Sequence, residues 1–170
     1  MRLCGEFGNV PGDASVNLER DNELMEVVPL DDRDRAWVAE TISREWGLPI
    51  VSVSGLHDPA ELEGFVAVEA DERLGLVTYR TTNEECEVVT LNALRPRNGV
   101  GTALLRAVKQ MADERGLRLW LITTDENSNA IGFYEKRGMI KRVQHPDFVT
   151  VVRRYKPNSQ GYRDAIEFSF

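Results

Sequence analysis

The change in hydrophobic periodicity near residue 95 places the tightest limit on what this chain can fold into. Residues 63–94 have the pattern of three consecutive strands divided by turn residues, supported by Phe65, Ala67 and the alternation in LGLVTYR over residues 74–80. Residues 99–115 instead carry apolar side chains at helical spacing, and the apolar strand 117–123 follows. A strand, a helix and a strand in succession predict a right-handed crossover between parallel neighbours. The chain therefore combines an antiparallel meander with one parallel strand–helix–strand unit.

The flanking segments extend this pattern to a mixed α/β domain. Further elements are expected in five segments: strands at 24–29, 139–143 and 165–170, and helices at 31–46 and 127–137. Segment 50–59 fits a loop or a short strand, and segment 147–155 fits either a strand or a helix. The predicted fold class is α/β, with a mixed, mostly antiparallel sheet flanked by helices. We expect a poorly structured extension over residues 1–22 and a single domain over residues 23–170.

Composition limits the classes of function that suit the chain. It has 170 residues and a formal net charge of −7, which argues against non-specific binding of nucleic acid. It has no apolar run of about 18 residues and no apolar signal segment, so membrane insertion and secretion are not expected. Two cysteines are too few for a disulfide framework or a structural zinc site, and no metal is expected. A cytoplasmic location is the expectation.

Charge is unevenly distributed along the sequence. Residues 58–87 hold nine acids and two arginines, whereas residues 95–118 hold six basic residues and two acids. These segments could be two solvated surfaces of opposite sign. They could also form one site, with a cationic end for an anionic ligand and an acidic end for a cationic ligand.

The loop before the long helix has the composition of an anion-binding turn. It reads RPRNGVGT over residues 95–102, and Gly99 and Gly101 remove side chains where a backbone could approach a ligand closely. The first turn of a helix has unpaired N–H groups and a partial positive charge, which together bind phosphate oxygens. The loop matches neither the dinucleotide-binding nor the Walker pattern. The same glycines could instead serve only to make a tight turn.

The second helix carries four residues at a distinctive spacing. Asn127 fits a helix N-cap, and Tyr134 fits a core residue whose hydroxyl lies at an edge. With Ala130 and Gly138 they form the pattern N-x-x-A-x-x-x-Y-x-x-x-G. This pattern, preceded by the GVG loop and a strand, resembles the Gcn5-related N-acetyltransferase (GNAT) family, as does the order of elements over residues 24–143.

The resemblance has two departures. The family usually has Gln or Arg three residues before the first glycine of the loop, where this chain has Pro96 between two arginines. The family's aromatic residue after the glycine that ends the second helix is Met139 here.

The resemblance implies an acyl-CoA N-acyltransferase fold that transfers an acetyl group from acetyl-CoA, its co-substrate, to a primary amine. It also implies the residues that bind acetyl-CoA: Ala93, Leu94, Arg97, Asn98, Gly99, Val100, Gly101, Thr102, Asn127, Ala130 and Tyr134. The amides around residues 97–102 would hold the pyrophosphate. Pantetheine would lie where the strand ending near 91–94 separates from strand 117–123, within reach of Asn127. A backbone N–H at Ala93 or Leu94 would polarise the thioester carbonyl.

Such a reaction must move two protons. An alkyl amine with the pKa of lysine is neutral only about once in 2,500 molecules at pH 7, so a base must deprotonate it. Glu87 is the candidate base, acting directly or through water, and Glu85 shares its face of the strand. Tyr134 is the candidate acid for the departing thiolate. The two carboxylates could equally be solvated surface charge. His57 could also face the acceptor pocket, but a lone loop histidine is more often incidental, and it is not counted among the candidate site residues.

Several alternatives stay open at the level of sequence. The acceptor would be a small-molecule or peptide amine, and an exposed edge strand could support a homodimer. The same fold could also serve as a catalytically silent acyl-CoA-binding sensor or partner module. A third possibility is a small α/β protein that binds another phosphorylated ligand at residues 97–102.

Overall fold

Seven strands hydrogen-bond into one sheet in the computed structural model, which describes residues 25–95, 99–158 and 164–170. The strands, including a separate two-stranded hairpin, are Glu26–Pro29 (β1), Ile50–Ser52 (β2), Gly55–His57 (β3), Glu63–Glu69 (β4), Glu72–Thr81 (β5), Glu85–Ala93 (β6), Arg118–Thr124 (β7), Ile140–His145 (β8) and Ala165–Ser169 (β9). The α-helices are Arg35–Trp46 (α1), Val100–Glu114 (α2), Ser128–Glu135 (α3) and Phe148–Tyr155 (α4). The order in the sheet is β1-β4-β5-β6-β7-β9-β8, and β2 pairs with β3.

The parallel pair in this sheet lies where the sequence predicts it. β6 and β7 run parallel and are connected through α2, whereas the other paired strands of the sheet run antiparallel. The predicted fold class, a mixed and mostly antiparallel sheet with a central strand–helix–strand unit, is confirmed. β8 forms one edge of the sheet and exposes Ile140 and Val143. Pairing of two chains along such an edge stays a prediction.

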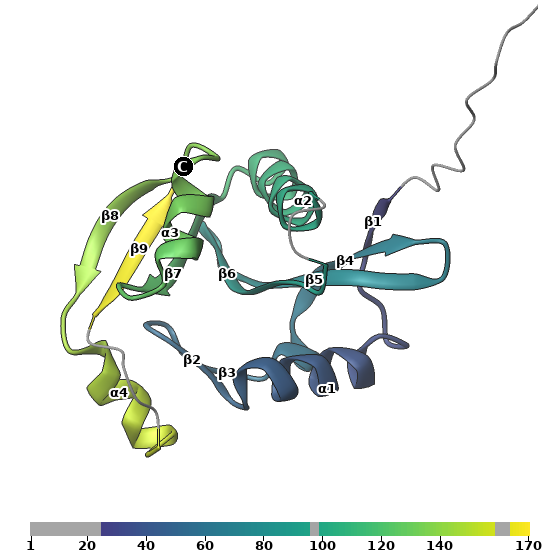
Figure 1. The fold of residues 1–170 in the computed structure, drawn as a ribbon. Coiled ribbons are helices and arrows are strands. Elements are labelled where there is room, and N and C mark those ends of the chain that lie inside the picture. The colour runs from purple at the N-terminus through teal and green to yellow at the C-terminus, as the bar shows by residue number, and fades with distance from the viewer. Residues whose placement is uncertain (1–24, 96–98, 159–163) are drawn as a thin grey trace, which may run out of the picture.

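Helices cover both faces of the sheet (Figure 1). α2 and α3 lie on one face, where Leu104 and Val108 of α2 belong to the same buried cluster as Val77 of β5. α1 lies on the opposite face, where Ile42 packs in a second cluster with Leu76. The β2–β3 hairpin and α4 lie on the α1 side, next to β6, β7 and β9 (Figure 1). The sheet therefore lies between helices, with a buried apolar cluster on each face.

Two segments that the sequence left open have defined structures. Residues 50–57 form the β2–β3 hairpin, and residues 148–155 form α4. Phe148, Val149 and Val152 of α4 are buried, a helical spacing that the β-branched composition of this segment obscured. The predicted extension over residues 1–22 lies outside the described residues. No helix in the described part of the chain has the length and apolar character needed to cross a membrane.

The acidic and basic segments of the sequence face each other in the fold. Among the described residues four ion pairs connect them: Arg95–Glu72 at 2.5 Å, Arg95–Glu69 at 4.0 Å, Arg115–Glu63 at 3.8 Å and Arg118–Glu85 at 2.7 Å. Exposed pairs of this kind contribute little to stability, about 0–1 kcal/mol each. Part of the contrast in charge is therefore neutralised locally.

Gly64 in β4 is expected to tolerate no side chain. A Cβ at this position would lie 2.2 Å from the Val77 carbonyl oxygen and 2.6 Å from Leu30 Cδ1. Backbone in the centre of a sheet cannot retreat, so Gly64→Ala should lower the free energy of unfolding by about 3 kcal/mol, measured by urea denaturation. Gly132→Ala in α3 is the control, because its Cβ would meet nothing within 4 Å, and it should stabilise by up to about 1 kcal/mol. Equal midpoints for Gly64→Ala and wild type would contradict this packing of β4 on β5.

Candidate functional site

β6 and β7 separate halfway along their length and leave a cavity between them. They pair only from Glu85 and Arg118 to Val88 and Leu121. At that point a β-bulge interrupts the pairing of β6 with β5, and bulges bend the strand that carries them. A cavity of about 650 Å³ opens beyond the last pair, with residues 88–91 and 121–124 in its walls. The family resemblance implies such a separation, and the structure places its start after Val88.

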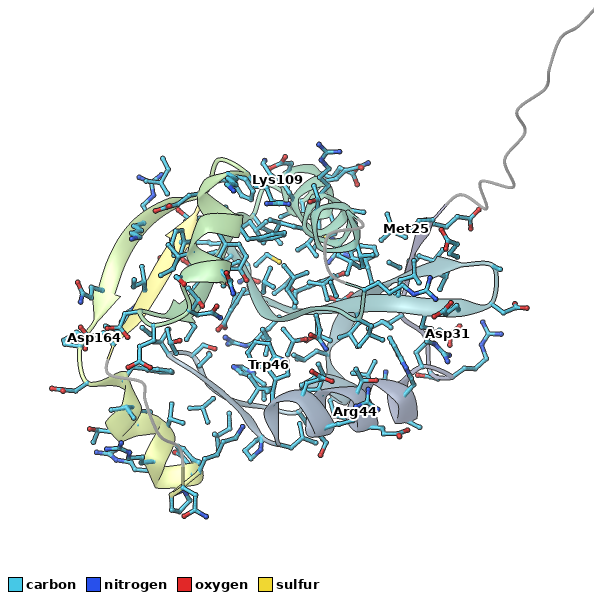
Figure 2. All side chains as sticks on the ribbon, in the orientation of Figure 1. Met25, Asp31, Arg44, Trp46, Lys109 and Asp164 are labelled. Carbon is cyan, nitrogen blue, oxygen red and sulfur yellow. The ribbon has the colours of Figure 1, made fainter. Side chains whose placement is uncertain are left out.

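The cavity reaches both faces of the sheet. On the α3 side its walls include Asn127, Ala130 and Tyr134. On the opposite side they include Trp46 and Ser52, together with residues of α4. Figure 2 shows Trp46 at the end of α1 nearest to β2 and β3. One continuous space therefore connects the two sides, so a ligand on the α3 side could meet a second molecule on the side of β2.

The N-terminus of α2, close to the end of β6, presents backbone donors that the helix itself does not use. Gly99 is the N-cap residue with φ of +80°, a conformation that favours glycine. The helix's hydrogen bonding begins with Ala103 N–H, which donates to the Gly99 carbonyl at 2.9 Å. The N–H groups of Val100, Gly101 and Thr102 consequently have no acceptor within the helix. Arg97 and Asn98, also predicted to bind the pyrophosphate, lie outside the described residues.

Arg137 lies next to these donors, and the sequence analysis did not include it in the candidate site. Arg137 Nε and Nη2 donate to Thr102 Oγ1 at 2.9 and 2.5 Å, and its guanidinium stacks 3.5 Å from the Phe133 ring centroid. Partial burial and the nearby charge of Arg106 lower the pKa of Arg137. Among the described side chains, no carboxylate pairs with Arg106 or with Arg137. An excess of positive charge therefore surrounds the unpaired amides, which suits an anion.

Tyr134 lies in the wall of the cavity with its ring in the core. The residue is 9% exposed, and its ring packs against Phe133 and Phe168 with centroids 5.3 and 5.7 Å away. Its hydroxyl makes no hydrogen bond within the described part of the chain. Burial raises the pKa of the phenol to about 12, so it stays protonated at neutral pH. The hydroxyl is therefore a proton donor that no group in the described part of the chain uses.

Asn127 and Ala130 have the positions that the sequence pattern predicts. Asn127 is the N-cap of α3, and its Oδ1 accepts a hydrogen bond from Ala130 N–H at 3.1 Å. The cap uses the carbonyl oxygen of this side chain and leaves the Nδ2 group available. Both residues lie in the cavity wall, where Nδ2 of Asn127 can donate to a ligand.

Of the two backbone donors predicted at the end of β6, the N–H groups of Ala93 and Leu94, only one is available to a ligand. Leu94 N–H donates to the Leu74 carbonyl at 2.8 Å, so the sheet already uses it, and its predicted role with a thioester is corrected. Successive N–H groups in an antiparallel strand point to opposite edges. Ala93 N–H therefore points away from β5, toward the side on which β7 has separated. Ala93 alone keeps the predicted role.

Glu87 is buried and does not itself lie in the wall of the cavity. It is 2% exposed, its Oε2 accepts a hydrogen bond from the Ser54 hydroxyl, and Arg80 Nη1 lies 3.8 Å from Oε2. Oε1 has no partner among the described residues. Glu85, the alternative base, is held by Arg118 at the start of β7. Glu87 thus lies outside the cavity wall, and its carboxylate is bonded to Ser54 of the protein itself.

His57 belongs to the hydrogen-bond network of Glu87. Its Nε2 lies 2.9 Å from Ser54 Oγ and 3.2 Å from Ser52 Oγ, and the two hydroxyls are 2.8 Å apart. Burial lowers the pKa of His57, with the Glu87 charge acting in the opposite direction and Arg80 assisting burial. The sequence analysis left His57 out of the candidate site, whereas the structure places it in contact with Ser52 and Ser54. The contact between residues 33 positions apart, Ser54 and Glu87, left no local signal in the sequence.

Comparison with known proteins finds a consistent set of relatives. Residues 18–139 match the model of the "Acetyltransferase (GNAT) family". The uncharacterized protein YdhI of Bacillus subtilis (strain 168) is 35% identical over 156 residues, which cover 86% of this chain and 98% of YdhI. The fold is similar to that of the ribosomal-protein-S18-alanine N-acetyltransferase from Escherichia coli, with a TM-score of 0.64, 18% identity, and coverage of 86% of this chain and 93% of that one. It is also similar to Arabidopsis thaliana Naa50 in complex with the bisubstrate analogue CoA-Ac-MVNAL, with a TM-score of 0.65, 19% identity, and coverage of 86% and 97%.

Proposed function

Because the chain belongs to the GNAT acetyltransferase family, we propose that it transfers the acetyl group of acetyl-CoA to the primary amine of a small molecule or peptide. The cavity between β6 and β7 carries this proposal. It opens where the strands separate and continues to the other face of the sheet, and Tyr134, whose hydroxyl has no partner among the described residues, lies in its wall. A thioester and an amine can approach each other there from opposite sides.

Residues near the start of α2 would hold the phosphates of acetyl-CoA. The N–H groups of residues 100–102 supply unpaired donors, and Arg137 and Arg106 supply positive charge. Arg97 and Asn98 complete this proposed set. Pantetheine would lie in the cavity against Ala130, with Asn127 Nδ2 donating to one of its amides.

The chemical step would use three groups of the chain. Ala93 N–H would donate to the thioester oxygen as it gains negative charge. Glu87 would receive a proton from the ammonium group, which frees the nitrogen lone pair to attack the acetyl carbon. As the carbon–sulfur bond breaks, the sulfur leaves with its electron pair and takes the Tyr134 proton. The second proton that the nitrogen loses on forming the amide restores the phenol.

Arg137→Ala should raise the Kd for acetyl-CoA by about tenfold. Loss of a hydrogen bond to a charged group costs about 1.5–3 kcal/mol, and Arg106 and the helix N-terminus would retain part of the attraction. Isothermal titration calorimetry measures the change. S-acetylpantetheine, which lacks the pyrophosphate and the 3′-phosphate, is the control and should bind wild type and variant equally. Unchanged affinity for acetyl-CoA would place its phosphates elsewhere.

A thiol-release assay with acetyl-CoA and a panel of primary amines tests the proposed function. Cys86 does not interfere, because it is fully buried and burial raises the pKa of its thiol to about 12. The expected result is CoA release that depends on at least one amine. Binding of acetyl-CoA without turnover of any amine would contradict the proposed activity and favour the catalytically silent sensor or partner module.

A further inference from the structure

The buried position of Glu87 raises the question of how a proton from the cavity could reach it. Its carboxylate is separated from the cavity, whereas Ser52, two hydrogen bonds away, is one of the cavity-lining residues. The connection between them runs from Ser52 Oγ to Ser54 Oγ and from there to Glu87 Oε2. Every step of this connection lies within the β2–β3 hairpin and the adjacent β6.

Counting donors and acceptors assigns a direction to each hydrogen bond. An ionised carboxylate can only accept, so the single proton of the Ser54 hydroxyl goes to Glu87. Ser54 Oγ must then accept from both of its other partners, so Ser52 donates its hydroxyl proton and His57 donates from Nε2–H. All three bonding positions of the Ser54 hydroxyl are thereby used.

The same count leaves one position open on Ser52. Its hydroxyl donates to Ser54, accepts from the Ser54 backbone N–H at 3.0 Å, and also lies 3.2 Å from His57 Nε2. Nε2 carries one proton, and the count assigns that proton to Ser54, which is nearer at 2.9 Å. A hydroxyl oxygen has two lone pairs, so one remains for a further donor. Since Ser52 lies in the cavity wall, an ammonium group of the acceptor is a donor that could fill it.

We infer that Ser52 and Ser54 form a proton path that carries the acceptor's proton from the cavity to Glu87, with His57 fixing its direction. This inference rests on the proposed function. The nitrogen–hydrogen bond of the ammonium group breaks as its proton passes to Ser52 Oγ, and the electron pair stays on nitrogen. At the same time the Ser52 proton passes to Ser54 and the Ser54 proton to Glu87 Oε2. Each serine is a neutral hydroxyl before and after, and the net change is the transfer of one proton from the ammonium group to Glu87.

Two further features support the proton path: the position of His57 and the exposure of Ser54. His57 positions Ser54 rather than touching the substrate, and burial keeps its imidazole neutral at pH 7. Arg80 from β5 and Glu87 from β6 are the charged groups that act on it. Ser54 lies at the surface of the hairpin, so the proton on Glu87 has a route to solvent after each turnover.

Ser52→Ala should lower kcat/KM for the amine about 100-fold at pH 7, within the range of a lost general base. The loss should shrink toward none near pH 10, where much of an alkyl amine is already neutral. Ser52→Thr keeps a hydroxyl and should remain within about threefold of wild type. Val53→Ala, in the exposed turn of the same hairpin, is the control for a general disturbance. Adding Ser52→Ala to Glu87→Gln should cause no further loss, because both act on one path.

The tautomer of His57 is a measurement independent of turnover. Nitrogen-15 NMR of histidine-labelled protein should show neutral His57 protonated at Nε2, with His145→Gln assigning the second histidine of the chain. Protonation at Nδ1 instead would overturn the path whatever the activity. If wild type transfers acetyl groups and Ser52→Ala matches it at pH 7, the path fails and the proposed function stands. If wild type binds acetyl-CoA and acetylates no amine, the proposed function fails and takes the catalytic path with it.

Discussion

Glu87→Gln is expected to lower kcat/KM for the amine about 1,000-fold at pH 7, within the range that a general base contributes. Glutamine has nearly the shape of glutamate, and its carbonyl oxygen can accept the Ser54 hydrogen bond that Oε2 accepts now. It cannot hold a proton at neutral pH. The variant therefore depends on the roughly one in 2,500 amine molecules that is neutral at pH 7, and its rate should rise tenfold per pH unit until the amine titrates.

Acetyl-CoA affinity is the control for Glu87→Gln. Glu87 lies behind the cavity wall, so the Kd for acetyl-CoA should stay within twofold of wild type. A stopped-flow or colorimetric thiol-release assay across pH 6–10 gives the profile. A variant with the wild-type rate and profile would show that Glu87 is a structural carboxylate paired with Ser54 and Arg80.

Tyr134→Phe is expected to lower kcat about 100-fold, with little change in the Kd for acetyl-CoA. The hydroxyl has no protein partner among the described residues, so its removal leaves no broken hydrogen bond. The remaining ring keeps its packing against Phe133 and Phe168. A phenol with a pKa of about 12 is a weaker acid than a thiol of pKa near 8.5. Tyr134 should therefore stabilise the departing sulfur mainly by hydrogen bonding, and the loss should lie at the lower end of the range for acid catalysis.

The thermal stability of Tyr134→Phe separates chemistry from folding. The variant should melt within about 2 °C of wild type, because the substitution changes no packed carbon atom. A kcat equal to that of wild type, measured at saturating acetyl-CoA and amine, would remove Tyr134 as the acid. A large fall in melting temperature would show that the hydroxyl has a partner beyond the described residues.

The order of elements could be predicted because each follows from local pattern. Residues 100–114 carry an apolar stripe, and glycines with positive φ angles lie on either side of this helix, Gly99 at its N-cap and Gly116 just after its end. α4 could not be resolved in the same way, because its Val and Thr residues suit strands while their spacing suits a helix. Its burial against Ala165 of β9 decides the outcome, and no local signal reports that contact.

The candidate site could be predicted only where it depends on short segments. Asn127 caps α3 through a residue three positions away, and this contact is readable from the sequence. The exclusion of Leu94 depends on which edge of β6 its N–H faces, and that requires the register of β5. The network of Ser52, Ser54 and His57 with Glu87 requires the hairpin to fold onto β6.

A crystal structure with CoA and an amine acceptor would test the central claim most directly. We predict the pyrophosphate on the N–H groups of residues 100–102 and the sulfur within hydrogen-bond distance of Tyr134 Oη. We also predict the acceptor nitrogen on the side of the cavity that contains Ser52. A complex in which CoA binds outside the gap between β6 and β7, or in which the Tyr134 hydroxyl points away from the sulfur, would contradict the account.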